Sequence, residues 1–175
     1  MQNGCNDPTC MDLCFMKFMR LYTVILLGII ACKPKAKCDK VDFDYSIAVE
    51  QEAITYLESN VATHGFGGKS ICATSFLGAD STALYLLYYC QEFYTSNGNK
   101  LEGTGEAGPI AMYYETNNGA VKFMGHKKPR DGNLYAKDIK ALFPEWVQEG
   151  IKKNESEMSR MHTAIKKRIS NTDMK

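Results

Sequence analysis

The chain has 175 residues and a mass of 19.6 kDa, which allows one domain with tails. Hydrophobic residues make up 45% of it and charged residues 23%, and this ordinary globular usage excludes disorder throughout the chain. The formal net charge is +1, so there is no whole-chain electrostatic footprint for nucleic acid and we expect no nucleic-acid partner.

Residues 1–31 have the order of a leader and secretory signal peptide. The basic stretch Met16–Arg20 is followed by the apolar run Leu21–Ala31 and then by Cys32. The run is shorter than the roughly 20 apolar residues that a membrane-spanning helix needs. Residues 1–15 fit no part of a signal, and we expect the natural start to follow them.

The residues Ile29, Ile30, Ala31 and Cys32 resemble the lipobox of bacterial lipoproteins, in which an aliphatic and a small residue precede an invariant cysteine. The resemblance implies cleavage before Cys32 and lipidation of its amine and thiol with acyl chains such as palmitate. We therefore expect a lipid anchor at a membrane of the bacterial cell envelope, with inner and outer membrane unresolved. The alternative is a lone cysteine after an ordinary signal or a buried helix.

Residues 32–43 form the expected lipidated tether, which is rich in lysine, and residues 44–150 form the expected domain. Apolar residues between Asp44 and Val61 recur at spacings of seven, three and four, which predicts the first helix. After this helix the period changes to two. Strands are predicted over residues 70–77, 82–94, 110–116 and 120–125.

The glycine-rich stretch Gly103–Pro109 is predicted as a loop, because the strand and helix that flank a dinucleotide-binding motif are missing. Asn-Gly pairs at 97–98 and 118–119 predict turns. The predicted fold class is α+β. An N-terminal helix packs on a curved antiparallel sheet of about four strands and is followed by a C-terminal helix.

The longest predicted strand is apolar on both of its faces. One face meets the first helix, and the other meets the C-terminal segment or a partner. The default ligand site is the concave face of the sheet. The candidate ligand-facing residues are Tyr85, Leu87, Tyr89 and Phe93, or the alternate set on the other face.

The C-terminal part is predicted to be helical. Residues 134–143 form a short helix, and an apolar stripe continues from Trp146 to Ile169. Residues 151–175 carry seven Lys or Arg and three Asp or Glu, so this C-terminal helix is basic and amphipathic. We expect a solvated helix whose end frays, with contact to anionic lipid as the alternative.

The cysteines predict no metal site, because the three that precede residue 16 lack the paired spacing of zinc ligands. If Cys32 is acylated, Cys38, Cys72 and Cys90 remain, and three cysteines cannot all pair within the chain. Cys72 and Cys90 could face each other across a hairpin, but the register is open. Buried free cysteines are therefore the favoured interpretation.

The stretch Pro129–Pro144, with the pattern PRDGxxYxxDIKxxFP, resembles the ending of small exported bacterial domains of uncharacterised function. Those domains are also similar in a tyrosine-rich strand, here Tyr88–Tyr94, and in a glycine-rich segment before a proline-led strand, here Gly105–Ile110. The resemblance covers roughly residues 44–150. It implies a cystatin-like or nuclear-transport-factor-like cone, in which a curved antiparallel sheet wraps a helix, and it implies no catalytic residues.

No catalytic, metal or cofactor motif occurs, and the three histidines have no partner at a spacing that predicts shared geometry. We therefore expect a lipoprotein that is not an enzyme and has no cofactor. Its domain binds an envelope protein or a small ligand, or has a structural role. The alternatives are a small envelope enzyme with His126 or Asp131 at a cavity mouth, and an inhibitor or immunity-type partner presenting the loops 64–68 or 103–108.

Overall fold

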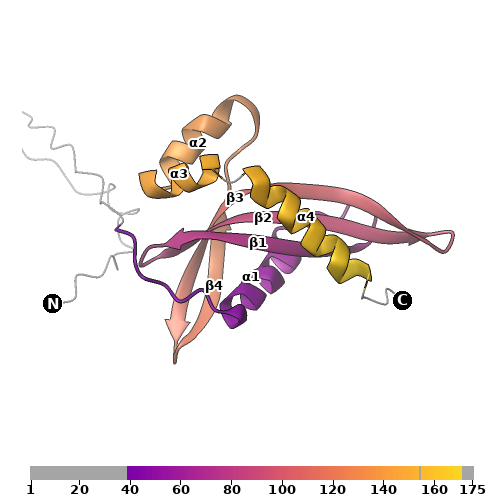
Figure 1. Ribbon diagram of the computed structural model, residues 1–175, viewed down its shortest axis with the longest axis horizontal. Helices are drawn as coiled ribbons and strands as arrows, with labels where there is room; N and C mark the ends of the chain where they lie inside the picture. The colour runs from indigo at the N-terminus through magenta and orange to yellow at the C-terminus, as the bar shows by residue number, and fades with distance from the viewer. Residues whose placement is uncertain (1–38, 154, 171–175) are drawn as a thin grey trace, which may run out of the picture. The chain divides into compact units, whose positions relative to one another are not determined.

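The computed structural model describes residues 39–153 and 155–170, and it confirms the α+β fold class (Figure 1). Four antiparallel strands form one sheet in the order β1-β2-β3-β4. One helix precedes the sheet and the others follow it. The elements are α1 (Ile47–Asn60), β1 (Lys69–Ala79), β2 (Ala83–Ser96), β3 (Asn99–Asn117), β4 (Ala120–Lys127), η2 (Gly132–Leu134), α2 (Tyr135–Leu142), α3 (Glu145–Lys153) and α4 (Glu155–Ser170).

Helix α1 lies against one face of the sheet. Its residues Ala53, Ile54 and Leu57 are buried in a core that also contains four alternating side chains from the first part of β2. In β2 these side chains are those of Leu84, Leu86, Tyr88 and Cys90. Because a helix of 14 residues is marginal on its own in water, this buried contact is what stabilises α1.

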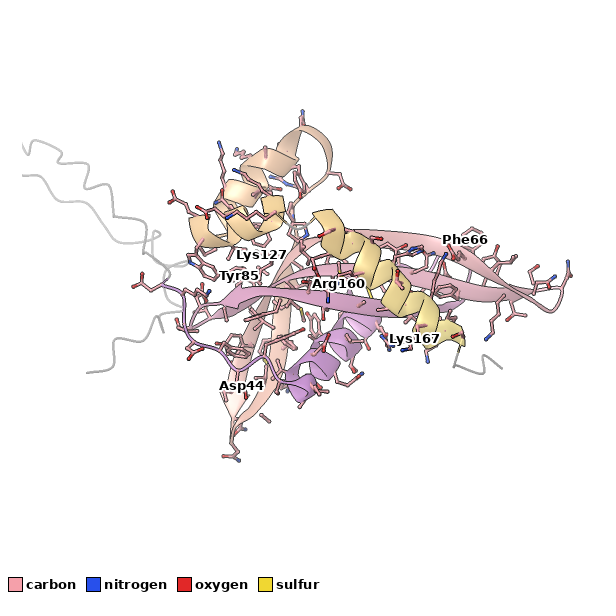
Figure 2. The ribbon with its side chains drawn as sticks, in the orientation of Figure 1. Asp44, Phe66, Tyr85, Lys127, Arg160 and Lys167 are labelled. Atoms are coloured by element: carbon pink, nitrogen blue, oxygen red, sulfur yellow. A yellow bond between two sulfur atoms is a disulfide. The ribbon has the colours of Figure 1, made fainter. Side chains whose placement is uncertain are left out.

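The C-terminal helices cover the opposite face of the sheet. Met161 and Ile165 of α4 pack with Leu87 and Phe93 of β2, and α3 packs over Tyr85 (Figure 2). The second apolar face of β2 therefore meets the C-terminal segment. In the described ranges, no helix has the length and apolar character that crossing a membrane requires.

The stretch Gly103–Pro109 is a strand, so the prediction of a loop is wrong. It belongs to β3, which pairs with β2 along its length apart from one register shift. The shift lies beside Glu92, whose side chain crosses the backbone of Gly103. A Cβ atom on Gly103 would come 2.7 Å from Glu92 Oε2. Pairing with β2 outweighs the low strand propensity of glycine, and the missing side chain makes room for the carboxylate.

Cys72 of β1 and Cys90 of β2 form a disulfide, so the favoured interpretation of free buried cysteines is wrong. The register places the two residues directly opposite each other, with their Cα atoms 4.1 Å apart. Adjacent positions of this kind bring two side chains close enough to bond. The pair is buried on the α1 side of the sheet.

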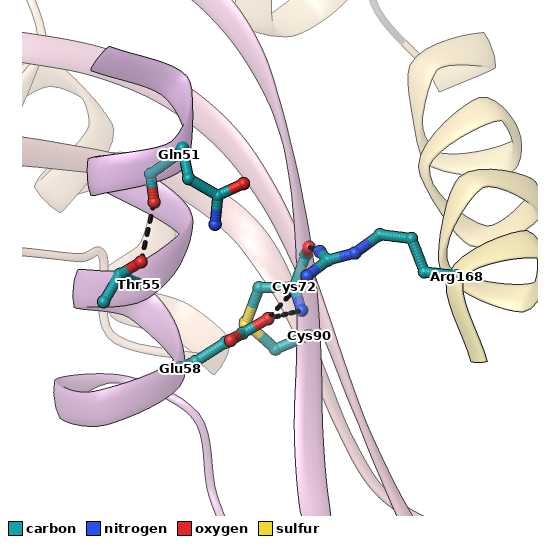
Figure 3. Close-up of polar contacts among 6 residues, drawn as sticks. All are labelled: Gln51, Thr55, Glu58, Cys72, Cys90 and Arg168. Carbon is teal, nitrogen blue, oxygen red and sulfur yellow. Dashed lines mark hydrogen bonds and ion pairs between the residues drawn. A yellow bond between two sulfur atoms is a disulfide. The ribbon is translucent and has the colours of Figure 1, made fainter. Parts of the chain in front are cut away.

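Strand β1 is an edge strand, and charged side chains cover its outer side at Cys72 (Figure 3). The Cys72 N–H donates to Glu58 Oε1 at 3.1 Å, and the Arg168 guanidinium donates to the Cys72 carbonyl oxygen. Arg168 also pairs with Glu58, with Nη2 and Oε1 3.3 Å apart. We call Glu58 and Arg168, with the Cys72 backbone between them, the edge clamp. It joins α1 and α4 across β1 and occupies backbone groups with which a strand of another chain could pair.

Candidate functional site

The candidate ligand-facing residues lie beneath the C-terminal helices. Tyr85, Leu87 and Phe93 are 4%, 3% and 5% exposed. Tyr89 is half-buried, and its ring packs edge-on against His162 of α4. These side chains are core residues here, and a ligand would reach them only if α3 or α4 moved away. The expected lipidation site, Cys32, lies outside the described residues.

The buried carboxylate of Glu92, near the C-terminal end of β2, holds the loop between α1 and β1 in place. Glu92 is fully buried, and its oxygens accept the backbone N–H groups of Gly65, Phe66 and Gly68 at 2.8–3.2 Å. They also accept the N–H of Thr104 in β3 at 3.1 Å. Burial favours the neutral acid, but the amides outweigh it and lower the pKa of Glu92 to about 2. The carboxylate is therefore ionised at neutral pH.

Glycines allow the loop to approach the sheet this closely. Gly67 has a φ of +71°, in the left-handed region that residues with a side chain rarely adopt. A Cβ atom on Gly68 would lie 2.2 Å from the carbonyl oxygen of Phe93. The loop between α1 and β1 is thus fixed by its glycines and by Glu92 together.

The loop presents Phe66 on an exposed apolar surface (Figure 2). The Phe66 ring stacks on Tyr94 of β2, with ring centroids 4.8 Å apart and an interplanar angle of 7°. Leu101 of β3 lies opposite Tyr94 in the strand register. Phe66 is 61% exposed and Leu101 is 42% exposed. We call these three residues the aromatic platform, and exposed apolar groups in a fixed position are typical of binding surfaces.

Sequence reasoning missed both Glu92 and Phe66. One signal was available, because Glu92 is a charged residue within an apolar strand, and such residues are buried only with partners. The partners lie 12 to 27 residues away along the chain. No spacing rule identifies them at that distance.

A second group of polar side chains lies between α1 and the strands β3 and β4. Tyr56 Oη and His126 Nδ1 are 3.1 Å apart. Tyr88 donates to Glu106 Oε1 at 2.7 Å, and Lys128 pairs with the same carboxylate. Burial and the charge of Lys128 lower the pKa of His126, although Glu106 opposes them. Burial also raises the pKa of Tyr56, so the phenol keeps its proton, and its contact with His126 ties α1 to β4.

The structure also brings Asp131 into this region. Asp131 is exposed at the N-terminus of the 3-10 helix η2, and its charge contributes to the raised pKa of Tyr88, after burial and Glu106. Of the two residues considered for a catalytic role, Asp131 acts on Tyr88 through its charge, and His126 is subject to the charge of Glu106. Tyr88 and Glu106 are hydrogen-bonded to each other, and His126 is hydrogen-bonded to Tyr56.

Among the described residues, no group of three or more His, Cys, Asp or Glu side chains is placed to hold a metal ion. Comparisons of the chain with protein-family models, with curated proteins and with solved structures give no significant match. The geometry of the described residues and the expected targeting order of residues 16–32 are therefore the basis of the functional proposal.

Proposed function

We propose that the protein is a lipoprotein of the bacterial cell envelope, attached to a membrane through acylated Cys32, and that its domain is a non-catalytic binding module. The order of basic, apolar and small residues before Cys32 carries this proposal. The proposal includes a cystatin-like cone, as implied by the stretch Pro129–Pro144. The observed order of one helix, an antiparallel sheet and further helices supports it.

The Cys72–Cys90 disulfide supports export, and it does so independently of the targeting segment. Disulfides persist in oxidising compartments and are rare in the bacterial cytosol. The two cysteines face each other in adjacent strands, within a core that excludes water. Secretion across the inner membrane would place this pair in an environment where the bond forms and lasts.

The aromatic platform supports a protein as the binding partner. Aromatic side chains supply much of the energy at the centres of protein interfaces. Phe66 is exposed, yet its backbone is held by Glu92, so little conformational freedom is lost on binding. The loop 64–68 is also one of the loops expected of an inhibitor or immunity-type protein, which is one form of this function.

The anchor is tested by metabolic labelling with radioactive palmitate in a bacterial host. We expect label in the full chain and none in the Cys32→Ala variant. Cys38→Ala is the matched control, because it removes a neighbouring cysteine and leaves the lipobox intact. Equal labelling of the wild type and Cys32→Ala would reject the anchor.

The platform is tested by placing a photo-reactive phenylalanine analogue at position 66 and, separately, at position 124. Met124 is 55% exposed on β4 and serves as a control of similar exposure. We expect a discrete cross-linked protein adduct from position 66 only. Tyr94→Ala in the same chain should abolish the adduct, because it removes the ring on which Phe66 stacks. Equal adducts from both positions would contradict a specific site.

A further inference from the structure

We propose that the end of the domain that contains Lys40 and Trp146 rests on the anionic headgroup surface of the membrane, and that the aromatic platform points away from it. This inference rests on the proposed function, since it needs an acylated Cys32. We define the entry end by the residues Lys40, Val41, Phe43, Phe76 and Trp146.

The length of chain between the anchor and the fold limits where the domain lies. Asp39 is seven residues after Cys32, so the two Cα atoms are separated by at most roughly 25 Å of extended chain. Val41 is the first residue paired with the sheet, and its N–H donates to the Ala79 carbonyl oxygen at 3.0 Å. The C-terminal end of β1 is therefore the part of the sheet with which the chain first pairs after Cys32, among the described residues.

The side chains at the entry end suit a membrane interface. A surface hollow of about 370 Å³ is lined by Lys40, Val41, Asp42, Phe43 and Phe76. Trp146 is a residue of α3 and packs against the sheet. The ammonium group of Lys40 lies 5.8 Å from the centre of its ring. Tryptophan and lysine are favoured at headgroup depth, because each combines an apolar body with a polar end.

Charge complementarity points to an anionic surface. Residues 33–40 contain four lysines and a single acid, Asp39. Lysines close to a lipid anchor are attracted to anionic headgroups within about one Debye length, roughly 10 Å. The acids Asp42 and Asp44 come later, on the far side of the lysines from Cys32. Residues 33–44 therefore carry four lysines against three acids, and the excess of positive charge lies on the Cys32 side of this stretch.

The aromatic platform lies at the other end of the sheet. Tyr94 is ten residues beyond Leu84 in β2, and Leu84 is opposite Ala79 at the entry end. Ten residues of strand span roughly 33 Å, so a membrane under the entry end leaves the platform free. Lys166 of α4 does not share the entry end, because it pairs with Glu102 of β3 near the β2–β3 hairpin.

The test uses native fluorescence, since Trp146 is the only tryptophan in the chain. The full-length acylated protein is reconstituted in vesicles of phosphatidylglycerol and phosphatidylcholine that carry bromine near the top of the acyl chains. We expect bromine to quench more than half of the Trp146 emission. Quenching should fall in vesicles of phosphatidylcholine alone and in the Lys40→Gln variant.

The matched control moves the reporter to the platform. Phe66→Trp is combined with Trp146→Phe, and the tryptophan introduced at position 66 should keep its full emission in the same vesicles. Unquenched native Trp146, or equal quenching at positions 146 and 66, would overturn the inference. Because the native chain gives the main reading, poor folding of the variant does not decide the result.

Failure of the two proposals can be told apart by flotation. A chain that does not float with the vesicles and takes up no palmitate contradicts the lipid anchor. A chain that is acylated and floats, but whose Trp146 is not quenched, contradicts only the orientation. A loss of quenching in Lys40→Gln without loss of flotation supports a direct contact between the entry end and the headgroups.

Discussion

Two buried carboxylates lie near opposite ends of β2, and their hydrogen-bond partners differ in how far away they are along the chain. Asp80, in the turn before β2, accepts the N–H groups of Thr82 and Ala83, both at 2.8 Å, and the Tyr85 hydroxyl at 2.6 Å. All three partners lie within five residues of it. Glu92 accepts amides that lie 12 to 27 residues away along the chain.

We call Asp80 the short-range anchor and Glu92 the long-range anchor, according to the distance along the chain to their hydrogen-bond partners. In both carboxyls burial favours the neutral acid, and hydrogen bonds outweigh it and lower the pKa. Asp80 stabilises the turn to which it belongs. Glu92 instead fixes a separate loop on the sheet, and in doing so it places Phe66 on the surface. Substitutions at the two sites should therefore have different effects on stability and on binding.

The largest effect is expected from Glu92→Gln. The amide group of glutamine brings N–H donors toward backbone N–H groups that need an acceptor, at a fully buried position. We expect the greatest loss of thermal stability in this set, together with loss of cross-linking at position 66. Thermal unfolding followed by circular dichroism measures the first. Glu115→Gln, at an exposed position on β3, is the control, and an equal loss there would contradict the role of Glu92.

The same carboxylate predicts a dependence of stability on pH. The pKa of Glu92 is lowered from 4.5 to about 2 in the folded state, so its contribution is complete above about 4.5. It is lost as the pH falls from about 4.5 toward about 2. Melting temperatures measured across this range should fall more steeply for the wild type than for Glu92→Gln. Parallel curves would show that Glu92 does not contribute.

Removal of the disulfide is expected to have the next largest effect. Cys72 and Cys90 are 18 residues apart, and a closed loop of this length stabilises a fold by about 3 kcal/mol. The double variant Cys72→Ser with Cys90→Ser should lose about this much in urea unfolding, in which reduced and oxidised wild type are also compared. Cys38→Ser, which leaves the disulfide intact, should unfold like the wild type.

A smaller effect is expected at the short-range anchor. Asp80→Ala removes an acceptor from two backbone amides and two hydroxyls, and comparable caps contribute about 1–2 kcal/mol. We expect that loss in urea unfolding and no change in cross-linking at position 66. If Asp80→Ala reduced cross-linking as strongly as Glu92→Gln, the distinction between the two anchors would fail.

The smallest effect is expected at the edge clamp. The Arg168 side chain is 41% exposed, and exposed ion pairs contribute at most about 1 kcal/mol. Arg168→Ala should reduce stability by no more than this, and high salt should reduce the difference from wild type. Lys167→Ala removes a neighbouring charge without removing the contacts at Cys72, so it should have less effect than Arg168→Ala. An equal effect of the two variants would contradict the clamp.

Several elements of the fold follow from residues that are close together in the sequence. The apolar period predicts a helix where α1 forms, and the period of two predicts most of the strands. The turns at 97–98 and 118–119 have positive φ at both residues, as their Asn-Gly pairs predict. The expected targeting segment and the lipidation of Cys32 also rest on local order alone, and they stay predictions because these residues lie outside the described part of the chain. In each case the deciding interactions span only a few residues.

Other features needed the folded chain, because they depend on which distant segments meet. The register of β1 against β2 decides that Cys72 faces Cys90, and a shift of one residue would separate them. The packing of α3 decides that Tyr85 is a core residue, and the packing of α4 does the same for Leu87 and Phe93. The capture of distant amides by Glu92 decides that Phe66 is presented to solvent. The hydrophobic periodicity of the sequence does not specify these contacts. Each contact depends on several distant segments packing together and burying the same residues.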